Sequence, residues 1–412
     1  MPDYPPGSFT SGYEEYWRKS IDFTDEAIRH SSLVLDTNSI LNLYRMKLSA
    51  RNEYLRVLEK AADRIWIPRQ VADEFHKNRI SSVAGHRRSL EDKHKAVLEA
   101  AGTLKAKLRD FYRLHSLADG RSNEYLAPLN ESIDQITETV RDEVQEYDLN
   151  PGSLLSNDPI LTKIAVLFDG KVGDGLPEET YEEAKEEAKR RGDTSTPPGY
   201  IDMQQKGEDG VGDFIIWTEM LEHAKKSQKG ILFVSTDTKE DWIRIQCGMS
   251  VGPRPELVRE MRETADASYH QLPLSLFLAR AAEVFEVEVS QDTINQANEA
   301  TQSEEKAKQH VLRRQEQIED LDEKIMEVRK MLLPVMQKLN VTLKQETYLR
   351  NQLSGADSEE NREQLFSDLS ALASDRKHLE ERVNGIRNGL GALESQKDSF
   401  MTEVTVLERW AI

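Results

Sequence analysis

The sequence predicts an α/β domain built on a parallel sheet with a helical insertion, followed by an all-α antiparallel coiled-coil hairpin. Up to about residue 290, short apolar runs that end in an acid alternate with amphipathic helical patterns, which is typical of a parallel sheet covered by helices. Beyond that point, apolar residues recur at intervals of three and four, as in a coiled coil. We therefore expect the α/β domain over 1–290, with its insertion at about 80–210, and the hairpin over 291–412.

Length and composition narrow the class of protein. The chain has 412 residues, 38% of them hydrophobic, and a formal charge of −19, so it can build a full core but has no overall attraction for nucleic acid or anionic membranes. Its one cysteine, Cys247, cannot form an internal disulfide, and no Cys/His cluster has zinc spacing. The N-terminal stretch lacks the pattern of a secretory signal, and no run of about 18 apolar residues occurs. We expect a soluble, cytoplasmic protein that does not contact a membrane.

Two strand–helix units open the α/β domain. Residues 31–36, SSLVLD, form a short apolar run that ends in Asp36, and a helical pattern follows it. A second apolar run, RIWIP at 64–68, stops at a proline and leads into a helix whose first turns carry Glu74. We expect both runs to be strands of the sheet.

The insertion and the last units of the domain follow. Residues 80–147 read as long charged helices, and 149–210 read as a loop-rich lobe with many Gly and Pro residues. The amphipathic helix GVGDFIIWTEMLEHAKK carries Asp213 near its start, and the apolar strand after it, KGILFVSTD, ends in Asp237. Residues 270–289 are expected to form a closing helix and then a strand, VFEVEV.

Four acids share one position relative to these elements. Each follows a predicted strand or opens a helix beside it, where parallel α/β sheets place functional groups. Carboxylates that converge repel one another unless a cation lies between them. Oxygen ligands without Cys or His favour Mg²⁺ or Mn²⁺, whose waters can supply a nucleophile for phosphodiester hydrolysis. We expect the four acids to be catalytic and metal-binding: Asp36, Glu74, Asp213 and Asp237.

The strings that carry these acids resemble a known family. VLDTNSILNLYR, WIPRQVADEFHKNR, PPGYID, GDFIIW and FVSTDTKEDW occur in this order, and together they are similar to the PIN-like nucleases, most of all to a bacterial PIN-like subfamily with a long insertion. The resemblance covers roughly residues 8–290. It implies a parallel sheet flanked by helices, an acidic site for Mg²⁺ or Mn²⁺, and cleavage of single-stranded RNA or structured nucleic acid. It also suggests roles such as a toxin or an anti-phage effector.

The resemblance assigns roles residue by residue. The four acids match the metal ligands of the family, and Asn38 matches the polar residue that positions Asp36. Thr238 stands where many relatives have a second Asp, so the choice between one and two metal ions stays open. Asp241, which we expect one helical turn further on, is a substitute ligand, with a helix-start acid as the alternative.

Other residues near these motifs have simpler interpretations. Asp202 and Lys206 precede Asp213 and are expected to form a lip over the site. The aromatic residues of the motifs are interpreted as core or rim residues in preference to base-stacking residues, and His76 as structural. These aromatic residues are Trp66, Trp217 and Trp242.

A basic stretch at the start of the insertion opposes the acidic charge of the chain. On a helix beside an acidic pocket, such residues can follow a phosphate backbone. A solvated helix face is the alternative, because Glu91 and Asp92 are interleaved with them. The predicted nucleic-acid-binding residues are Arg69, Lys77, Arg79, Arg87 and Arg88.

The C-terminal part reads as two helices separated by the breaker SGADSEE at 354–360. Pro334 is expected to kink the first helix, and Thr342, Glu346 and Arg376 interrupt the apolar seam. A surplus apolar face would recruit a second copy or another protein. The seam residues are Ile318, Leu321, Ile325, Val328, Leu332, Val335 and Leu339, then Leu365, Leu369, Leu372, Leu379, Val383, Ile386, Leu390 and Leu393.

Three functional hypotheses follow. The first is a metal-dependent endonuclease, with RNA as the favoured substrate and DNA as the alternative. The second is a non-catalytic PIN-like scaffold that binds nucleic acid or protein through its coiled coil, which the missing acid at Thr238 favours. The third is hydrolysis of a small phosphorylated ligand, which a pocket closed by the 149–210 lobe would favour.

Overall fold

The α/β domain is built on a small parallel sheet. β2 (Ile231–Ser235) lies between β1 (Ser32–Leu35) and β5 (Tyr269–Pro273), and both neighbours pair with it in parallel. Every residue of β1 and β2 is buried, as expected of apolar strands covered on both faces. This confirms the parallel sheet that the sequence predicts. The structure is a computed structural model that describes residues 13–16, 21–114, 119–236, 239–247, 249–355 and 358–411.

Two predicted strands have another structure. RIWIP makes isolated bridges, from Ile65 to Leu33 and from Ile67 to Val172, and is not a full strand. The prediction of a strand at VFEVEV is wrong, because its first residues end α12 (Leu274–Phe285) and residues 286–290 form no strand. The closing strand is β5, which precedes this helix. Pro273 ends β5 and caps α12, since proline has no N–H to give to a further strand pair.

Helices pack around the sheet and complete its core. α1, α2 and α12 contact β2, and α11 and α12 contact β5. Val34, Phe233 and Phe277 are among the side chains that this packing buries. The bounds of these helices and of two that pack beside them are α1 Ile21–His30, α2 Thr37–Leu41, α3 Leu48–Lys60, α10 Gly212–Ser227 and α11 Pro255–Ala265.

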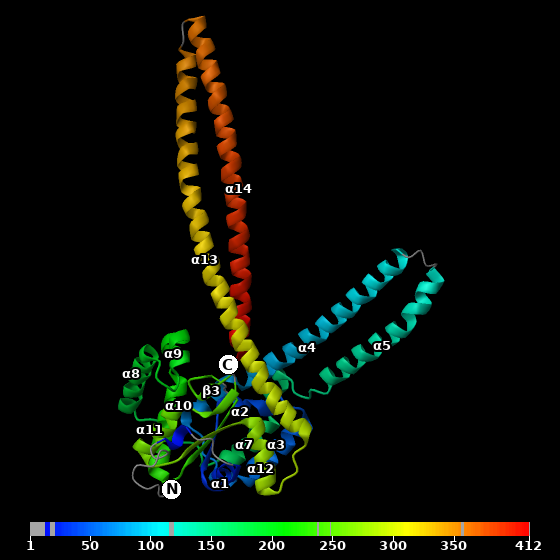
Figure 1. Cartoon of the computed structure of the whole chain (residues 1–412), viewed down its shortest axis with the longest axis vertical. Helices are drawn as coiled ribbons and strands as arrows, with labels where there is room; N and C mark the ends of the chain where they lie inside the picture. Colours follow the sequence, from blue (N-terminus) through cyan, green and yellow to red (C-terminus); the bar gives the residue numbers. More distant parts are fainter. Residues whose placement is uncertain are drawn as a thin grey trace. The chain divides into compact units, whose positions relative to one another are not determined.

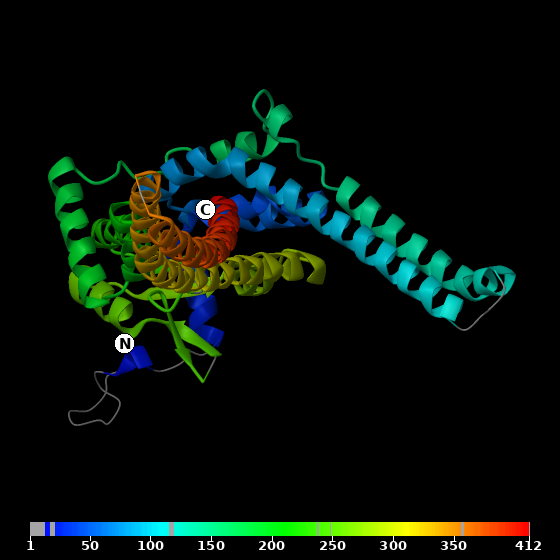
Figure 2. The same ribbon diagram turned by 90° about the horizontal axis from the view of Figure 1, so that it is seen from above.

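Two long helices account for the charged pattern after residue 80. α4 (Arg69–Leu114) and α5 (Asp119–Gln145) run side by side (Figures 1 and 2), and Lys105 of α4 pairs with Asp134 of α5 at 2.9 Å. α4 begins well before the predicted insertion, so a single helix carries Glu74 and then continues into the helical pair.

Residues 149–210 are more helical than their Gly and Pro content predicts. Pro151 and Pro159 do not break helices but open them, because proline fits the first helical position. Asn150 and Asp158 cap these two helices with their side chains. The helices of this lobe are α6 Pro151–Leu154, α7 Pro159–Phe168, α8 Glu178–Thr194 and α9 Tyr200–Lys206.

The segment after β2 differs from its prediction. Residues 240–242 form a turn that leads into an antiparallel ribbon of β3 (Ile243–Gln246) and β4 (Met249–Pro253). Asp241 therefore lies in a turn and not one turn along a helix. The short 3-10 helices of the chain are η1 Glu14–Tyr16, η2 Asn42–Tyr44, η3 Ala62–Arg64 and η4 Gly207–Gly210.

The chain divides into two compact units, one that ends at Glu305 and one that spans Lys306–Ala411. The second unit pairs the later part of α13 (Gln291–Ser354) with α14 (Glu359–Ala411) as a long antiparallel hairpin, as the heptad pattern predicts. Five of the fifteen predicted seam residues are buried in it, and the other ten are partly exposed. The buried ones are Leu321, Ile325, Leu365, Leu379 and Val383.

Polar residues inside the seam are paired. Glu346, only 5% exposed, forms ion pairs with Arg376 of the opposite helix at 3.1 Å and with Arg350 at 2.5 Å. Buried charges are tolerated when they are paired in this way. α13 remains one continuous helix through Pro334. In the described part of the chain, no helix is both long and apolar enough to cross a membrane.

Candidate functional site

Asp36 lies where β1 ends and α2 begins. Its backbone N–H continues the sheet by donating to the carbonyl oxygen of Val234 at 2.9 Å. Its Oδ1 accepts a hydrogen bond from the N–H of Thr37 at 2.8 Å, and its Oδ2 accepts one from the Ser235 hydroxyl, at the end of β2, at 2.9 Å. The carboxylate is therefore fixed at the carboxyl edge of the sheet, as the strand pattern predicts.

Glu74 is joined to Asp36 through Thr37. The Thr37 hydroxyl donates to Oε2 of Glu74 at 2.7 Å, while its backbone N–H donates to Oδ1 of Asp36, the residue that caps α2. Gln70, one turn earlier on α4, donates to Oε1 of Glu74 at 2.8 Å. Thr37 and Gln70 thus hold Glu74 in one orientation from two sides.

Asp213 approaches Glu74 from the first turn of α10. Gly212 packs so closely that a Cβ on it would lie 2.8 Å from Oε1 of Glu74. Burial raises the pKa of the Glu74 carboxyl, and the negative charge of Asp213 raises it further, while the hydrogen bonds from Thr37 and Gln70 oppose the rise. Three of the four predicted acids, Asp36, Glu74 and Asp213, therefore belong to one connected site.

A lysine and a second aspartate extend the site on the side of Asp213. Lys239 Nζ lies 2.5 Å from Oδ1 of Asp202 and 3.2 Å from Oδ2 of Asp213. Trp242 Nε1 donates to the same Asp213 oxygen at 3.3 Å, and Lys206 pairs with Asp202 at 3.1 Å. Asp202 and Lys206 thus border the acids, as the proposed lip requires.

Asp241 and Asn38 have different surroundings from those three acids. Asp241 is fully buried, and its Oδ2 accepts hydrogen bonds from the N–H groups of Gly199 at 3.0 Å and Ile201 at 3.3 Å, so it holds the start of α9. Asn38 follows Asp36 on α2, and its Oδ1 is buried with no hydrogen-bond partner among the described residues. Their roles as a metal ligand and as a supporting residue stay predictions. The predicted ligand Asp237 and its neighbour Thr238 lie outside the described residues.

The chemistry of these donors fits a hard divalent cation. Three carboxylates and the buried amide oxygen of Asn38 supply only oxygen, which Mg²⁺ and Mn²⁺ prefer. The residues that would hold such an ion are Asp36, Glu74 and Asp213. Among the described residues, however, no three His, Cys, Asp or Glu side chains form a ready-made metal site. The metal site of four acids therefore stays a prediction.

The predicted nucleic-acid-binding residues separate into two groups. Arg79 contacts the buried Asp158 at 3.3 Å and is mostly buried itself, so it serves the core. Arg69 and Arg87 form ion pairs along α4, with Asp73 at 3.0 Å and Glu91 at 3.1 Å. Lys77 and Arg88 are exposed and make no ion pair with the described residues. Arg69 and Arg87 are still 55% and 44% exposed in these pairs, so four of the five predicted cations remain accessible to a phosphate.

The aromatic residues of the motifs are core or rim residues, as predicted. Trp217 and Trp242 are buried, and their rings meet edge to face with centroids 6.2 Å apart. Trp66 is partly buried and stacks on His223 at 4.0 Å. His76 is exposed beside Phe75 on α4.

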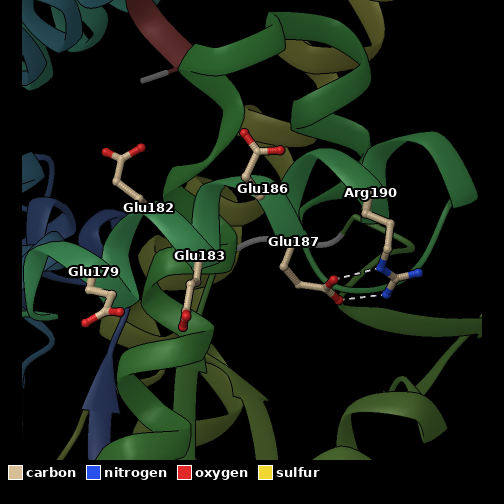
Figure 3. A pocket seen from close by; sticks show the side chains of 6 residues that line it. All are labelled: Glu179, Glu182, Glu183, Glu186, Glu187 and Arg190. Atoms are coloured by element: carbon tan, nitrogen blue, oxygen red, sulfur yellow. Dashed lines mark hydrogen bonds and ion pairs between the residues drawn. The ribbon is translucent and has the colours of Figure 1, made fainter.

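A surface groove of about 630 Å³ lies on the outer face of α8 and includes none of the predicted acids. Figure 3 shows its carboxylates spread along one helix and pointing in different directions, with one pairing with the arginine. A solvated helix face accounts for this arrangement. Its lining residues are Glu179, Glu182, Glu183, Glu186, Glu187 and Arg190.

Four residues that hold the site were not singled out from the sequence: Thr37, Gln70, Ser235 and Lys239. Three of them lie inside the motifs: Thr37 in DTN, Ser235 in FVSTD and Lys239 in KEDW. The only feature of the sequence that could have pointed to them is that each lies close to a predicted ligand or to another acid of its motif. Gln70 lies four residues before Glu74, the spacing at which helical side chains meet.

The fold and the site define a class of protein: an α/β domain whose acids meet at the carboxyl edge of a parallel sheet. A family model described as "PIN like domain" matches residues 32–257, more than half of the chain. The chain therefore belongs to the PIN-like domain family, whose members are generally nucleases. No curated protein and no solved structure matches the chain.

Proposed function

We propose that this protein is an endonuclease that hydrolyses phosphodiester bonds, most of all in RNA, and that depends on Mg²⁺ or Mn²⁺. One observation carries the proposal, in a chain of the PIN-like family. Thr37 links Asp36 and Glu74 by hydrogen bonds, and Gly212, next to Asp213, lies close against Glu74. Asp237, which follows Ser235 at the end of β2 by two residues in the sequence, is proposed as the fourth acid.

The protein groups have distinct proposed tasks at this site. A bound Mg²⁺ or Mn²⁺ would neutralise the phosphate and lower the pKa of a water. Asp36 and Asp213 would hold the cation, and the hydrogen bonds from Thr37 and Ser235 keep the Asp36 carboxylate in one orientation. Burial, and to a smaller extent the charge of Asp213, raises the pKa of Glu74, so a bound cation would help to keep it ionised.

The nucleic acid is proposed to run along α4. Lys77 and Arg88 are eleven residues apart, which is about three helical turns and places them on one face roughly 16 Å apart. Glu74 is one turn from Lys77 on the same helix. Two accessible cations in line with an acid of the site support binding of a phosphate backbone. RNA is placed before DNA because the family resemblance implies it.

Cleavage of end-labelled single-stranded RNA, single-stranded DNA and duplex DNA tests the proposal. Wild type is compared with Asp36→Asn, Glu74→Gln and Asp237→Asn in Mg²⁺, Mn²⁺ or EDTA. Asp73→Asn is the matched control, because Asp73 adjoins Glu74 but is 57% exposed and pairs with Arg69. Cutting that requires metal, is lost in the three site variants and survives in the control supports the nuclease. A folded wild type that cuts none of these substrates and binds no Mn²⁺ would favour the scaffold.

The cellular role is proposed from the same activity. An RNA-cleaving toxin or anti-phage effector in the cytoplasm would arrest growth when expressed, and Asp36→Asn would relieve the arrest. The hairpin is proposed to recruit a second copy or a protein partner, because Met326, Leu333 and Val341 on α13 are more than half exposed. Light scattering of the full chain measures whether it self-associates. Equal growth with both proteins argues against the effector role but leaves the nuclease.

A further inference from the structure

We propose that the hairpin carries a self-complementary surface on which a second copy of this chain docks antiparallel, with the two α13 helices side by side. The inference deepens the recruiting role proposed for the hairpin, on which it rests, and it names the partner and its orientation. Its basis is a stripe of exposed apolar side chains on the outer face of α13, along which the charge changes sign.

The apolar stripe lies on the side of α13 that faces away from the seam. Its members are Met326, Leu333, Val341 and Tyr348, each more than half exposed. Their spacings of seven, eight and seven residues keep them on one side of a helix that turns about 100° per residue. When the seam residues, such as Ile325, take heptad positions a and d, the stripe takes positions b and c, which face outward. Pairing with α14 therefore leaves the stripe uncovered.

Charged residues on the same outer face are acidic first and basic later. Heptad position f lies between b and c and is the position farthest from the seam. Its charged residues are exposed and form no ion pair with any residue that the structure describes. A charge nearer the seam is used inside the hairpin instead, since Asp322 pairs with Lys397 of α14 at 2.6 Å. The charged residues at position f are Glu316, Glu323, Lys330 and Lys344.

This order of charges favours an antiparallel pair over a parallel one. In a parallel pair in register, Glu323 would face Glu323 of the second copy, and the two like charges would repel each other. In an antiparallel pair centred beside Leu333, Glu323 faces Lys344 of the second copy, and Met326 faces Val341 of the second copy. Twofold symmetry repeats both contacts, as in other dimers built from one surface patch.

The same pattern identifies a second copy as the occupant. The acidic half of α13 complements the basic half of the same helix, so the surface matches itself when it is turned end to end. An unrelated protein would need to match only one half or the other. From Met326 to Tyr348 the stripe extends over about 33 Å of helix, and two such helices would form a four-helix arrangement with their α14 partners.

Sedimentation equilibrium of the full chain over a range of concentrations tests the inference without an activity assay. The charge variants are Glu323→Lys, Lys344→Glu and the chain that carries both changes. Met326→Glu tests the apolar stripe. Met331→Glu is its matched control, because Met331 is an exposed methionine of the same helix that lies outside the stripe. Circular dichroism checks that each variant keeps its helices.

We expect wild type and Met331→Glu to dimerise alike. Met326→Glu should weaken the dimer about 100-fold, because two methionines per dimer would no longer be buried. Glu323→Lys and Lys344→Glu should each weaken it about tenfold, because each reverses one charge in both ion pairs of the dimer. The chain with both changes should regain the wild-type affinity, and so should a mixture of the two single variants, because opposite charges face each other again.

A wild type that stays monomeric over the whole range overturns both the inference and the recruitment of a second copy by the hairpin. A dimer that the charge variants leave unchanged, or that the double change does not restore, overturns the antiparallel arrangement alone. Equal weakening by Met326→Glu and Met331→Glu also overturns the inference. None of these results bears on the nuclease, because a dimer that cuts no substrate and a monomer that cuts are both distinguishable outcomes.

Discussion

Replacing the buried Glu219 by Gln should change how the stability of the α/β domain depends on pH. Glu219 lies on α10, is 5% exposed and accepts hydrogen bonds from the N–H groups of Arg69 and Gln70 at the start of α4. Its Oε2 is buried with no hydrogen-bond partner among the described residues. Burial is the main cause that raises the pKa of Glu219 from 4.5 to about 7, and the negative charge of Asp73 adds to it.

The sign and size of the effect follow from proton linkage. Between pH 4.5 and 7 the folded protein holds the Glu219 proton and the unfolded chain does not, so the free energy of unfolding falls as the pH rises through this range. The stabilising contribution is complete below pH 4.5 and is lost above pH 7. At about 1.4 kcal/mol per pKa unit, the loss is at most about 3 kcal/mol.

Urea unfolding followed by tryptophan fluorescence measures this, since Trp217 and Trp242 are buried in the same domain. The quantity compared is the difference in free energy of unfolding between wild type and Glu219→Gln at pH 5 and at pH 8. We expect that difference to shift by up to about 3 kcal/mol in favour of the variant at pH 8. Glu222→Gln, on the same helix, controls for the loss of one negative charge. A difference that stays constant from pH 5 to pH 8 refutes the reasoning.

Three further substitutions test the site and α4. Gly212→Ala should lower kcat about 100-fold with little change in folding, because the new Cβ would lie 2.8 Å from the Glu74 carboxylate and displace that carboxylate. Single-turnover cleavage measures this effect, and an unchanged kcat contradicts the prediction. Arg79→Met should cost roughly 3 kcal/mol in urea unfolding because it removes the cation that pairs with the buried Asp158 and leaves its charge to hydrogen bonds from Tyr44 and Leu161. Arg88→Met should leave the free energy of unfolding unchanged but reduce the salt dependence of nucleic-acid binding by about one counterion. If Arg79→Met and Arg88→Met changed binding equally, the assignment of Arg79 to the core and of Arg88 to phosphate binding would be contradicted.

The sequence predicts the sheet where apolar runs are long and end in an acid. β1 and β2 meet this condition and lie as expected, with Asp36 at the end of β1. β5 does not, because its segment YHQLP mixes polar and apolar residues and its burial depends on α11 and α12 packing against it. RIWIP has the composition of a strand, but forms only single bridges to β1 and to Val172. Local pattern cannot show which neighbours a segment will pair with.

The candidate site could be predicted only in part for the same reason. The pattern identifies acids at strand ends, and Asp36, Glu74 and Asp213 are connected in the fold. The groups that orient them come from pairs distant in sequence, such as Ser235 with Asp36. A periodic pattern contains no information on such pairs. Arg79 shows the opposite error, since a basic residue in a basic run is used to neutralise a core carboxylate.

The continuity of α4 gives a length to the proposed nucleic-acid path. From Glu74 to Phe111 the helix runs without interruption, which corresponds to about 55 Å. A duplex that touched both points would extend over about 16 base pairs. Short oligonucleotides can reach the acids without reaching the far end of this helix. A nucleic-acid footprint that grows with the length of the nucleic acid up to this limit, and then stops growing, would indicate that the bound strand follows α4.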